Sequence, residues 1–350
     1  MSHDLKDTAT SITRPATIYD VAKRAGVSHQ TVTRVLRDYP GIRPATRERV
    51  TEALSALDYR PNLTARLLTT GEGRRIAAFT HELHQYGPSK VLQGATTIAR
   101  DAGYWLDVVT LNVSNPDEIS RAIDTMRQPD LAGILALSST DEMTRAFEAA
   151  EFGVPAVINA EERLHPNRGT AKPTLMEEIL GHLITLGHRD FLHIAGPRSW
   201  TAARNRRRDF RGAAEMLGVR TADMTEGDWS AESGYRATIN YLDSHPRSGS
   251  RVGITAIVAA NDQMALGAML ALSEAGFRIP HDVSVTGMDD IPDAAFFRPP
   301  LTTMRLDPEA QGRTACARLL SKINQDISFE SVDAEPQLIV RASTGQAPQR

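Results

Sequence analysis

The chain of 350 residues contains one cysteine and no long apolar run. The single thiol, Cys316, excludes an internal disulfide framework and a zinc cage built from cysteines. No stretch approaches the roughly 18 consecutive apolar residues that a membrane-spanning helix needs. Residues 1–14 are polar and charged, which does not match the apolar region of a secretory leader. These absences together predict a cytoplasmic protein.

Signature motifs of several enzyme classes are missing as well. The sequence has no G-x-x-x-x-G-K-[ST] phosphate loop, no G-x-S-x-G nucleophile elbow and no H-E-x-x-H pair. His182, His188 and His193 do not have the spacing of metal ligands, so we expect core or surface roles for them. We therefore expect no enzymatic activity, no metal and no cofactor.

The composition, with 41% hydrophobic and 24% charged residues, is that of a globular protein of about two domains. The net charge of −3 conceals an uneven distribution along the chain. Residues 1–75 contain 13 Lys and Arg against 8 Asp and Glu, whereas the remainder carries 27 against 35. A basic head on an acidic body indicates a polyanionic partner for the head. A chance clustering of solvated charges is the alternative.

The basic head has the pattern of three short helices. Thr17 is a suitable N-cap for the first helix, and Gly26 allows a tight turn before Ser28 caps the second. Apolar residues at helical spacing follow each cap, and Pro44 suits the first turn of a third helix. Three short helices around a small core predict a compact helix-turn-helix unit that binds DNA.

From residue 75 onward, short apolar strands alternate with amphipathic helices. The expected strands are Ile76–Phe79, Trp105–Thr110, Gly133–Leu137, Ala156–Ile158, Phe191–Ala195, Ala256–Ala260 and Val283–Thr286. The expected helices lie near residues 89–102, 117–127, 141–151, 174–187, 204–217, 231–243, 262–275 and 307–325. This alternation predicts parallel sheets flanked by helices, in two lobes with a ligand cleft between them.

Several blocks of the sequence resemble the LacI/GalR family of transcription regulators. These blocks are Thr17–Leu36, Arg60–Asn62, Ala65–Leu68, Leu186–His188, Ile194–Pro197, Glu226–Ser230, Ala260–Met269 and Pro299–Thr303. The resemblance implies a small all-α helix-turn-helix head on an α/β, two-lobed, periplasmic-binding-protein-like body with parallel sheets. The domains it implies are a disordered tail at 1–16, the head at 17–61, a hinge helix and linker at 62–74, the effector-binding and dimerisation body at 75–340, and a disordered tail at 341–350.

The second helix of the head is the expected reader of DNA sequence. An α-helix fits the major groove, where Gln pairs with adenine and Arg pairs with guanine. The resemblance further implies that Leu68 wedges into the minor groove, and packing of this leucine against the body is the alternative. The residues expected at DNA are Ser28, His29, Gln30, Thr31, Thr33, Arg34, Asn62, Ala65 and Leu68.

The resemblance also assigns a sugar site in the body. Trp229 matches the family's stacking tryptophan, and Arg206, Asn261 and Asp289 match residues that bind sugar hydroxyls. Asp141 matches a further polar contact. Each residue also has a structural alternative: Asn261 suits an N-cap, Asp289 suits an acidic turn, and Arg206 could belong to a solvated basic helix face.

Some residues near this site depart from the family's pattern. The family's pattern is not kept at Met288, Leu306 and Pro308, and residues 81–86 form a more polar wall on the side of the first lobe. We therefore expect a glycoside ligand to differ on its aglycone side from the glycosides that the family binds. The sequence predicts a repressor that binds a near-palindromic operator as a homodimer and is released by a small sugar, first of all a galactoside. A co-repressor-type regulator that responds to a purine, a nucleoside or a phosphorylated sugar is the alternative. A solute-binding protein is a third possibility, against which the head argues.

Overall fold

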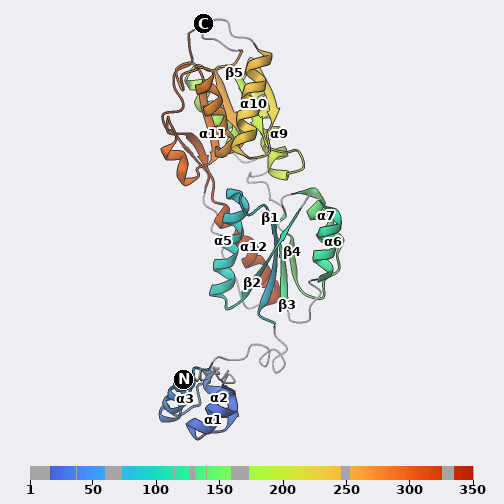
Figure 1. Cartoon of the computed structure of the whole chain (residues 1–350), viewed down its shortest axis with the longest axis vertical. Helices are drawn as coiled ribbons and strands as arrows, with labels where there is room; N and C mark the ends of the chain where they lie inside the picture. Colours follow the sequence, from blue (N-terminus) through green and yellow to red (C-terminus); the bar gives the residue numbers. More distant parts are fainter. Residues whose placement is uncertain are drawn as a thin grey trace, which may run out of the picture. The chain divides into compact units, whose positions relative to one another are not determined.

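The computed structural model describes residues 16–36, 38–59, 73–112, 115–125, 131–138, 140–158, 173–245, 253–324 and 335–349. The chain divides into two compact units, Met1–Glu72 and Gly73–Arg350. In the described part, the first unit holds three helices, and the second holds two α/β lobes (Figure 1).

The three helices of the first unit are α1 (Ile18–Ala25), α2 (His29–Leu36) and α3 (Pro44–Ala56). The Thr17 hydroxyl accepts a hydrogen bond from the Asp20 amide, and the Asp20 side chain bonds back to the Thr17 amide. Gly26 ends α1 with a φ of 65°, a left-handed conformation that suits glycine. Val21, Val32 and Val50 are buried at the centre, one from each helix. The predicted helix-turn-helix is confirmed.

The first lobe of the second unit has a four-stranded parallel sheet in the order β2-β1-β3-β4. Its strands are β1 (Arg75–His81), β2 (Trp105–Leu111), β3 (Leu131–Ala136) and β4 (Ala156–Ile158). One face is packed against α6 (Pro116–Thr125) and α7 (Asp141–Ala149), and the other against α5 (Tyr86–Asp101) and α12 (Pro308–Ile323). Cys316 lies on the buried face of α12, where burial raises the pKa of its thiol to about 12.

The second lobe has a six-stranded sheet in the order β10-β9-β8-β7-β5-β6. Its strands are β5 (Asp190–Ala195), β6 (Thr221–Glu226), β7 (Ala256–Ala259), β8 (Ser284–Asp289), β9 (Thr302–Arg305) and β10 (Gln337–Ile339), and only β10 pairs antiparallel. Helices α8 (Leu175–Thr185) and α9 (Thr201–Met216) cover one face. Helices α10 (Ala231–Ser244) and α11 (Asp262–Glu274) cover the other, and a short 3-10 helix, η1 (Pro292–Phe296), follows β8.

The expected parallel α/β architecture of the body is confirmed, with each predicted strand present. Three further strands, β6, β9 and β10, were not predicted. The prediction that residues 341–350 form a frayed tail is wrong for the described residues 341–349. Ser343 is fully buried: its hydroxyl accepts from the Thr302 amide at 2.7 Å and donates to the Val285 carbonyl at 2.6 Å. The polar Ser343 of this segment therefore makes hydrogen bonds to β8 and β9, two inner strands of the sheet.

Candidate DNA-binding and ligand-binding sites

Helix α2 presents polar side chains to solvent along the side away from its buried valines. The Ser28 hydroxyl accepts from the Thr31 amide at 3.2 Å and so caps the helix. His29, Gln30 and Arg34 are exposed. The helix therefore offers imidazole, amide and guanidinium groups on one surface, as reading of base edges requires.

Two aromatic contacts orient the ends of this surface. The His29 ring lies 5.2 Å from the Tyr19 ring, and the Arg34 guanidinium lies 5.6 Å from the centre of the Tyr39 ring. Arg47, a candidate for phosphate contact by its charge, instead donates to Asp38 at 2.5 Å and to the Tyr39 carbonyl at 3.1 Å. Its guanidinium thus holds the turn after α2.

The hinge residues predicted to contact DNA, Asn62, Ala65 and Leu68, lie outside the described residues. The Thr33 hydroxyl donates to the His29 carbonyl at 3.0 Å, within its own helix. In this structure the Thr33 hydroxyl therefore bonds within α2, and its oxygen still has capacity to accept a further bond.

Four of the five predicted ligand residues come together in the second lobe. They line one cavity of about 50 Å³, together with residues that begin α5 in the first lobe. The lining residues are Gln85, Tyr86, Gly87, Pro88, Trp200, Ala202, Arg206, Trp229, Asn261, Gln263 and Asp289. The site is thus built from the carboxyl ends of parallel strands and the helices that follow them, where α/β sheets usually bind ligands.

Arg206 is the central cation of this cavity. Its Nη1 donates to the Ala260 carbonyl, and its Nη2 lies 3.4 Å from Asp289 Oδ1. The guanidinium stands over the Trp229 ring at 5.5 Å. The side chains of Arg206 and Asp289 are only 11% and 15% exposed, so this pair is well shielded from solvent. The solvated helix face considered for Arg206 is therefore wrong.

Trp229 supplies an apolar face and a hydrogen-bond donor. It is buried, packs edge-on against Trp200 at 5.6 Å, and lies so close to Gly196 that a Cβ there would collide with the indole. Its Nε1 has no hydrogen-bond partner among the described residues. Trp229 and Asp289 also have backbone φ values of 74° and 113°, which residues other than glycine rarely adopt. Residues with such strained backbone angles are frequent at ligand sites.

Asn261 has a structural task in addition to its place in the cavity. Its side-chain oxygen accepts from the Met264 amide at 2.9 Å and so caps α11, which is the alternative considered from the sequence. Its Nδ2 donates to the Trp229 carbonyl at 2.9 Å. Asn261 therefore fixes the strained backbone of Trp229 while its side chain lines the cavity.

Asp141 does not join the other four predicted residues. It begins α7 in the first lobe and accepts from Arg204 Nη2 at 2.5 Å, outside the lining of the cavity. The isolated bridge between Thr140 and Trp200 lies beside this ion pair. Asp141 thus connects the first lobe to α9 of the second.

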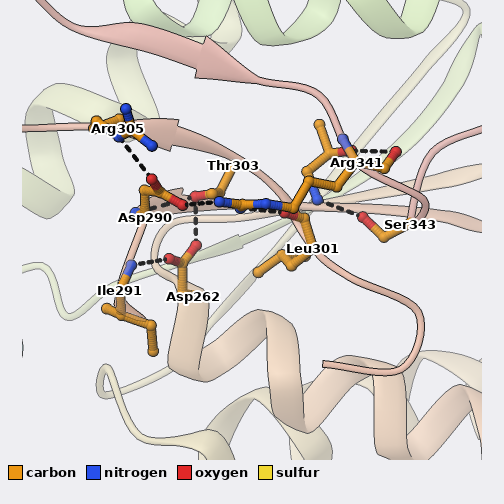
Figure 2. Close-up of polar contacts among 9 residues, drawn as sticks. Asp262, Asp290, Ile291, Leu301, Thr303, Arg305, Arg341 and Ser343 are labelled. Carbon is orange, nitrogen blue, oxygen red and sulfur yellow. Dashed lines mark hydrogen bonds and ion pairs between the residues drawn. The ribbon is translucent and has the colours of Figure 1, made fainter. Parts of the chain in front are cut away.

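A buried acidic network behind the cavity was not predicted from the sequence (Figure 2). Asp262 accepts from the Thr303 hydroxyl at 2.5 Å and from the Ile291 amide at 2.8 Å. Burial, and then the nearby Asp289, raises the pKa of Asp262 well above its usual value. Arg341 donates to the neighbouring Asp290 at 2.6 Å. These contacts hold Asp290 and Ile291, the two residues that directly follow Asp289 at the end of β8.

The histidines behave as packing residues. The rings of His182 and His188 bond to Thr344 and Thr255, and His193 bonds to the Val258 carbonyl at 2.8 Å. His81 is buried edge-on against Trp200, and burial lowers the pKa of its ring to about 4. Within the described part of the chain, no cluster of His, Cys, Asp and Glu is arranged to hold a metal ion. No described helix is long and apolar enough to cross a membrane.

Comparison with known proteins assigns both units. The model described as "Bacterial regulatory proteins, lacI family" matches residues 17–62, and that of a periplasmic binding protein-like domain matches residues 180–344. The lactose operon repressor of Escherichia coli K12 is 33% identical over 96% of this chain and 92% of its own. The repressor PurR of Proteus mirabilis is 30% identical over 95% of this chain and 98% of its own.

A solved structure agrees with these relatives. The lac repressor dimer bound to operator and the anti-inducer ONPF is 31% identical and superposes with a TM-score of 0.78, over 95% of this chain and 100% of the other. The match extends through the head and both lobes, in the same order as the sequence blocks. On these grounds the chain belongs to the LacI family of DNA-binding transcriptional repressors.

Proposed function

We propose that this repressor binds a near-palindromic operator as a homodimer and is released from it by a small neutral sugar, with a galactoside as the first candidate. The observation that carries the sugar assignment is the shielded Arg206–Asp289 pair over the Trp229 ring. The lac repressor, solved as a dimer bound to operator and the anti-inducer ONPF, supports a dimer that holds operator DNA and a small ligand at the same time.

The chemistry of the cavity suits a sugar. An indole face accommodates the apolar side of a pyranose ring, and Arg, Asp and Asn together provide both donors and acceptors for hydroxyl groups. The buried Nε1 of Trp229 adds a donor that no described residue uses. A purine offers fewer hydroxyl groups for this set, although the PurR relative keeps a purine co-repressor as the second candidate.

The size of the cavity implies movement on binding. A volume of about 50 Å³ is small compared with the roughly 300–1,000 Å³ of usual ligand pockets. Residues of both lobes line it, so a sugar requires the lobes to separate further than they do here. A ligand that prefers the wider arrangement shifts the population towards it, and DNA binding changes in a reciprocal manner.

A second copy of this chain is the proposed partner of an apolar surface on the second lobe. Leu266 and Leu270 are exposed one turn apart on α11, and Phe296 of η1 is 83% exposed. Apolar side chains that lie together on a surface can mark an interaction site, and Leu266 and Leu270 share one face of α11. The relative solved with operator is a dimer, and a near-palindromic operator requires two heads.

The experiment that tests the sugar assignment is a thermal-shift screen of the full chain. The panel holds galactosides, glucosides, free hexoses, disaccharides, purines and nucleosides, because binding to the native state raises the unfolding midpoint. The best ligand is then added to a complex of the chain with operator selected from random DNA. Release of DNA by a sugar supports the proposal, whereas tighter binding with a purine replaces it with the co-repressor function.

A further inference from the structure

A second cavity lies on α9, outside the sugar site. Its volume is about 370 Å³, and five arginines line it: Arg198, Arg204, Arg207, Arg208 and Arg211. None of them lines the cavity around Trp229. Arg198 comes from the loop after β5, and the other four follow one another on α9, at spacings that turn them towards a shared surface.

The negative charges at this cavity are fewer than the positive ones. Glu226 accepts from Arg198 at 3.0 Å and from Arg207 at 3.2 Å. Asp141 pairs with Arg204, and Asp209 pairs with Arg208. Arg211 contacts the Met224 sulfur at 3.3 Å. Among the described residues, five guanidinium groups thus share three carboxylates, which leaves two positive charges in excess.

Arg207 is the arginine of this cavity that the excess positive charge affects most. Its side chain is only 13% exposed, so much of its hydration is lost. Burial lowers the pKa of its guanidinium, the positive charges of Arg198 and Arg211 lower it further, and only Glu226 acts in the opposite direction. A shielded cation that neighbouring cations repel costs folding free energy unless an anion joins it. The arrangement is therefore that of a receptor for an anion.

We infer that this cavity binds a small dianion of the phosphate type, either free phosphate or the phosphoryl group of a metabolite. Two charges on the anion balance the excess. Planar guanidinium forks bind phosphate oxygens in pairs, which lysines do not. The volume also lies within the range of ordinary small-molecule pockets. Because Arg204 pairs with Asp141 of the first lobe, the site contacts a residue that joins the lobes.

The test is calorimetric titration of the full chain with inorganic phosphate, at an ionic strength held constant with sodium chloride. Arg211→Gln removes one exposed guanidinium from the cavity and leaves the ion pairs of Glu226 with Arg198 and Arg207 unchanged. Arg236→Gln is the matched control, because Arg236 is an exposed helical arginine of α10 that pairs with Glu232. We expect one phosphate site in the wild type and in the control, and a dissociation constant raised at least about tenfold in Arg211→Gln, by loss of a charge-assisted hydrogen bond.

A second titration, with a hexose 6-phosphate, separates the two sources of the phosphoryl group. Asp289→Asn, which changes the sugar cavity and leaves all five arginines in place, is included in both series. Binding that is weakened by Arg211→Gln and kept by Asp289→Asn supports the inference, and the tighter of the two ligands identifies the source. Binding that is kept by Arg211→Gln or lost in Asp289→Asn overturns it, as does failure of both ligands to bind the wild type. Circular dichroism spectra confirm that each variant is folded.

Discussion

Replacement of Arg206 by alanine tests the centre of the proposed ligand site. The guanidinium makes three contacts that the variant loses: a hydrogen bond to the Ala260 carbonyl, the ion pair with Asp289, and the stack on Trp229. All three are shielded, since Arg206 is 11% exposed. Solvent therefore cannot replace them fully.

The magnitude follows from these contacts. A hydrogen bond that involves a charged group contributes about 1.5–3 kcal/mol. A partly desolvated cation–π contact adds about 0.5–2 kcal/mol. The 3.4 Å separation from Asp289 is long, so we count this contact as minor. Arg206→Ala should then lower the free energy of unfolding by about 2–5 kcal/mol.

The assay is urea unfolding followed by circular dichroism, with Arg100→Ala as the control. Arg100 is an exposed arginine near the end of α5 whose ion pair among the described residues is with its neighbour Asp101, so the control should change stability by less than about 0.5 kcal/mol. In the same preparation, Arg206→Ala should raise the dissociation constant of the best sugar at least about tenfold. Operator affinity without ligand should stay unchanged.

Two results would refute this reasoning. An Arg206→Ala variant as stable as the Arg100→Ala control would mean that the observed contacts contribute nothing. A variant that binds the sugar and releases operator with the wild-type midpoint would remove Arg206 from the ligand site. The stability result and the binding result are independent, so the packing argument and the ligand argument can fail separately.

Three further predictions concern the head, the core and the C-terminal segment. Arg34→Ala should cost about 1–3 kcal/mol of operator affinity and relax one base preference in each half-site. Lys23→Ala, in contrast, should weaken binding to DNA of every sequence by a similar amount. Fluorescence anisotropy at several salt concentrations distinguishes the two effects. Burial lowers the pKa of His193 to about 4, so the unfolded state binds more protons below pH 6.5. The free energy of unfolding measured with urea should therefore fall by about 3 kcal/mol between pH 7 and pH 4 because of this group. In His193→Phe the unfolding free energy should depend less steeply on pH. Arg341→Ala should lower the unfolding free energy by about 1.5–3 kcal/mol, and more than Arg305→Ala, whose arginine is more exposed on the same Asp290. Equal losses from the two arginines would contradict the special role of the C-terminal segment.

The regular parts of the fold could be predicted because their apolar periodicity is local. The missed strands show the limit of this signal. β6 has the sequence Thr-Ala-Asp-Met-Thr-Glu and lies at the edge of its sheet, where burial does not demand an apolar run. β9 begins with two buried threonines, Thr302 and Thr303. Their hydroxyls are satisfied by Arg341, Thr344 and Asp262, about 40 residues away in the chain. Hydrogen-bonded pairs so far apart in the chain produce no periodic pattern in the sequence.

The ligand residues were predicted from resemblance, and the structure supplies their physical context. Composition alone could not distinguish Arg206 from its neighbours Arg207 and Arg208 on α9. Their different surroundings follow from helix geometry, because successive residues point about 100° apart. The buried network of Asp262 could not be predicted either. The sequence pattern shows an acidic residue after an N-cap, but it does not show that Thr303 and Ile291 hydrogen-bond to it. Asp141 illustrates the converse, because a residue matched by resemblance forms an ion pair elsewhere.

The contacts around Trp200 indicate how a ligand could change the arrangement of the lobes. Trp200 packs edge-on against His81, which ends β1 in the first lobe, and against Trp229 in the second. Thr140 of the first lobe forms an isolated bridge to the backbone of the same tryptophan. On the proposed function, a sugar that stacks on Trp229 would lie next to Trp200, a side chain that both lobes share. Because packed aromatic contacts have few alternative arrangements, a change at Trp200 would favour discrete arrangements of the lobes over gradual deformation.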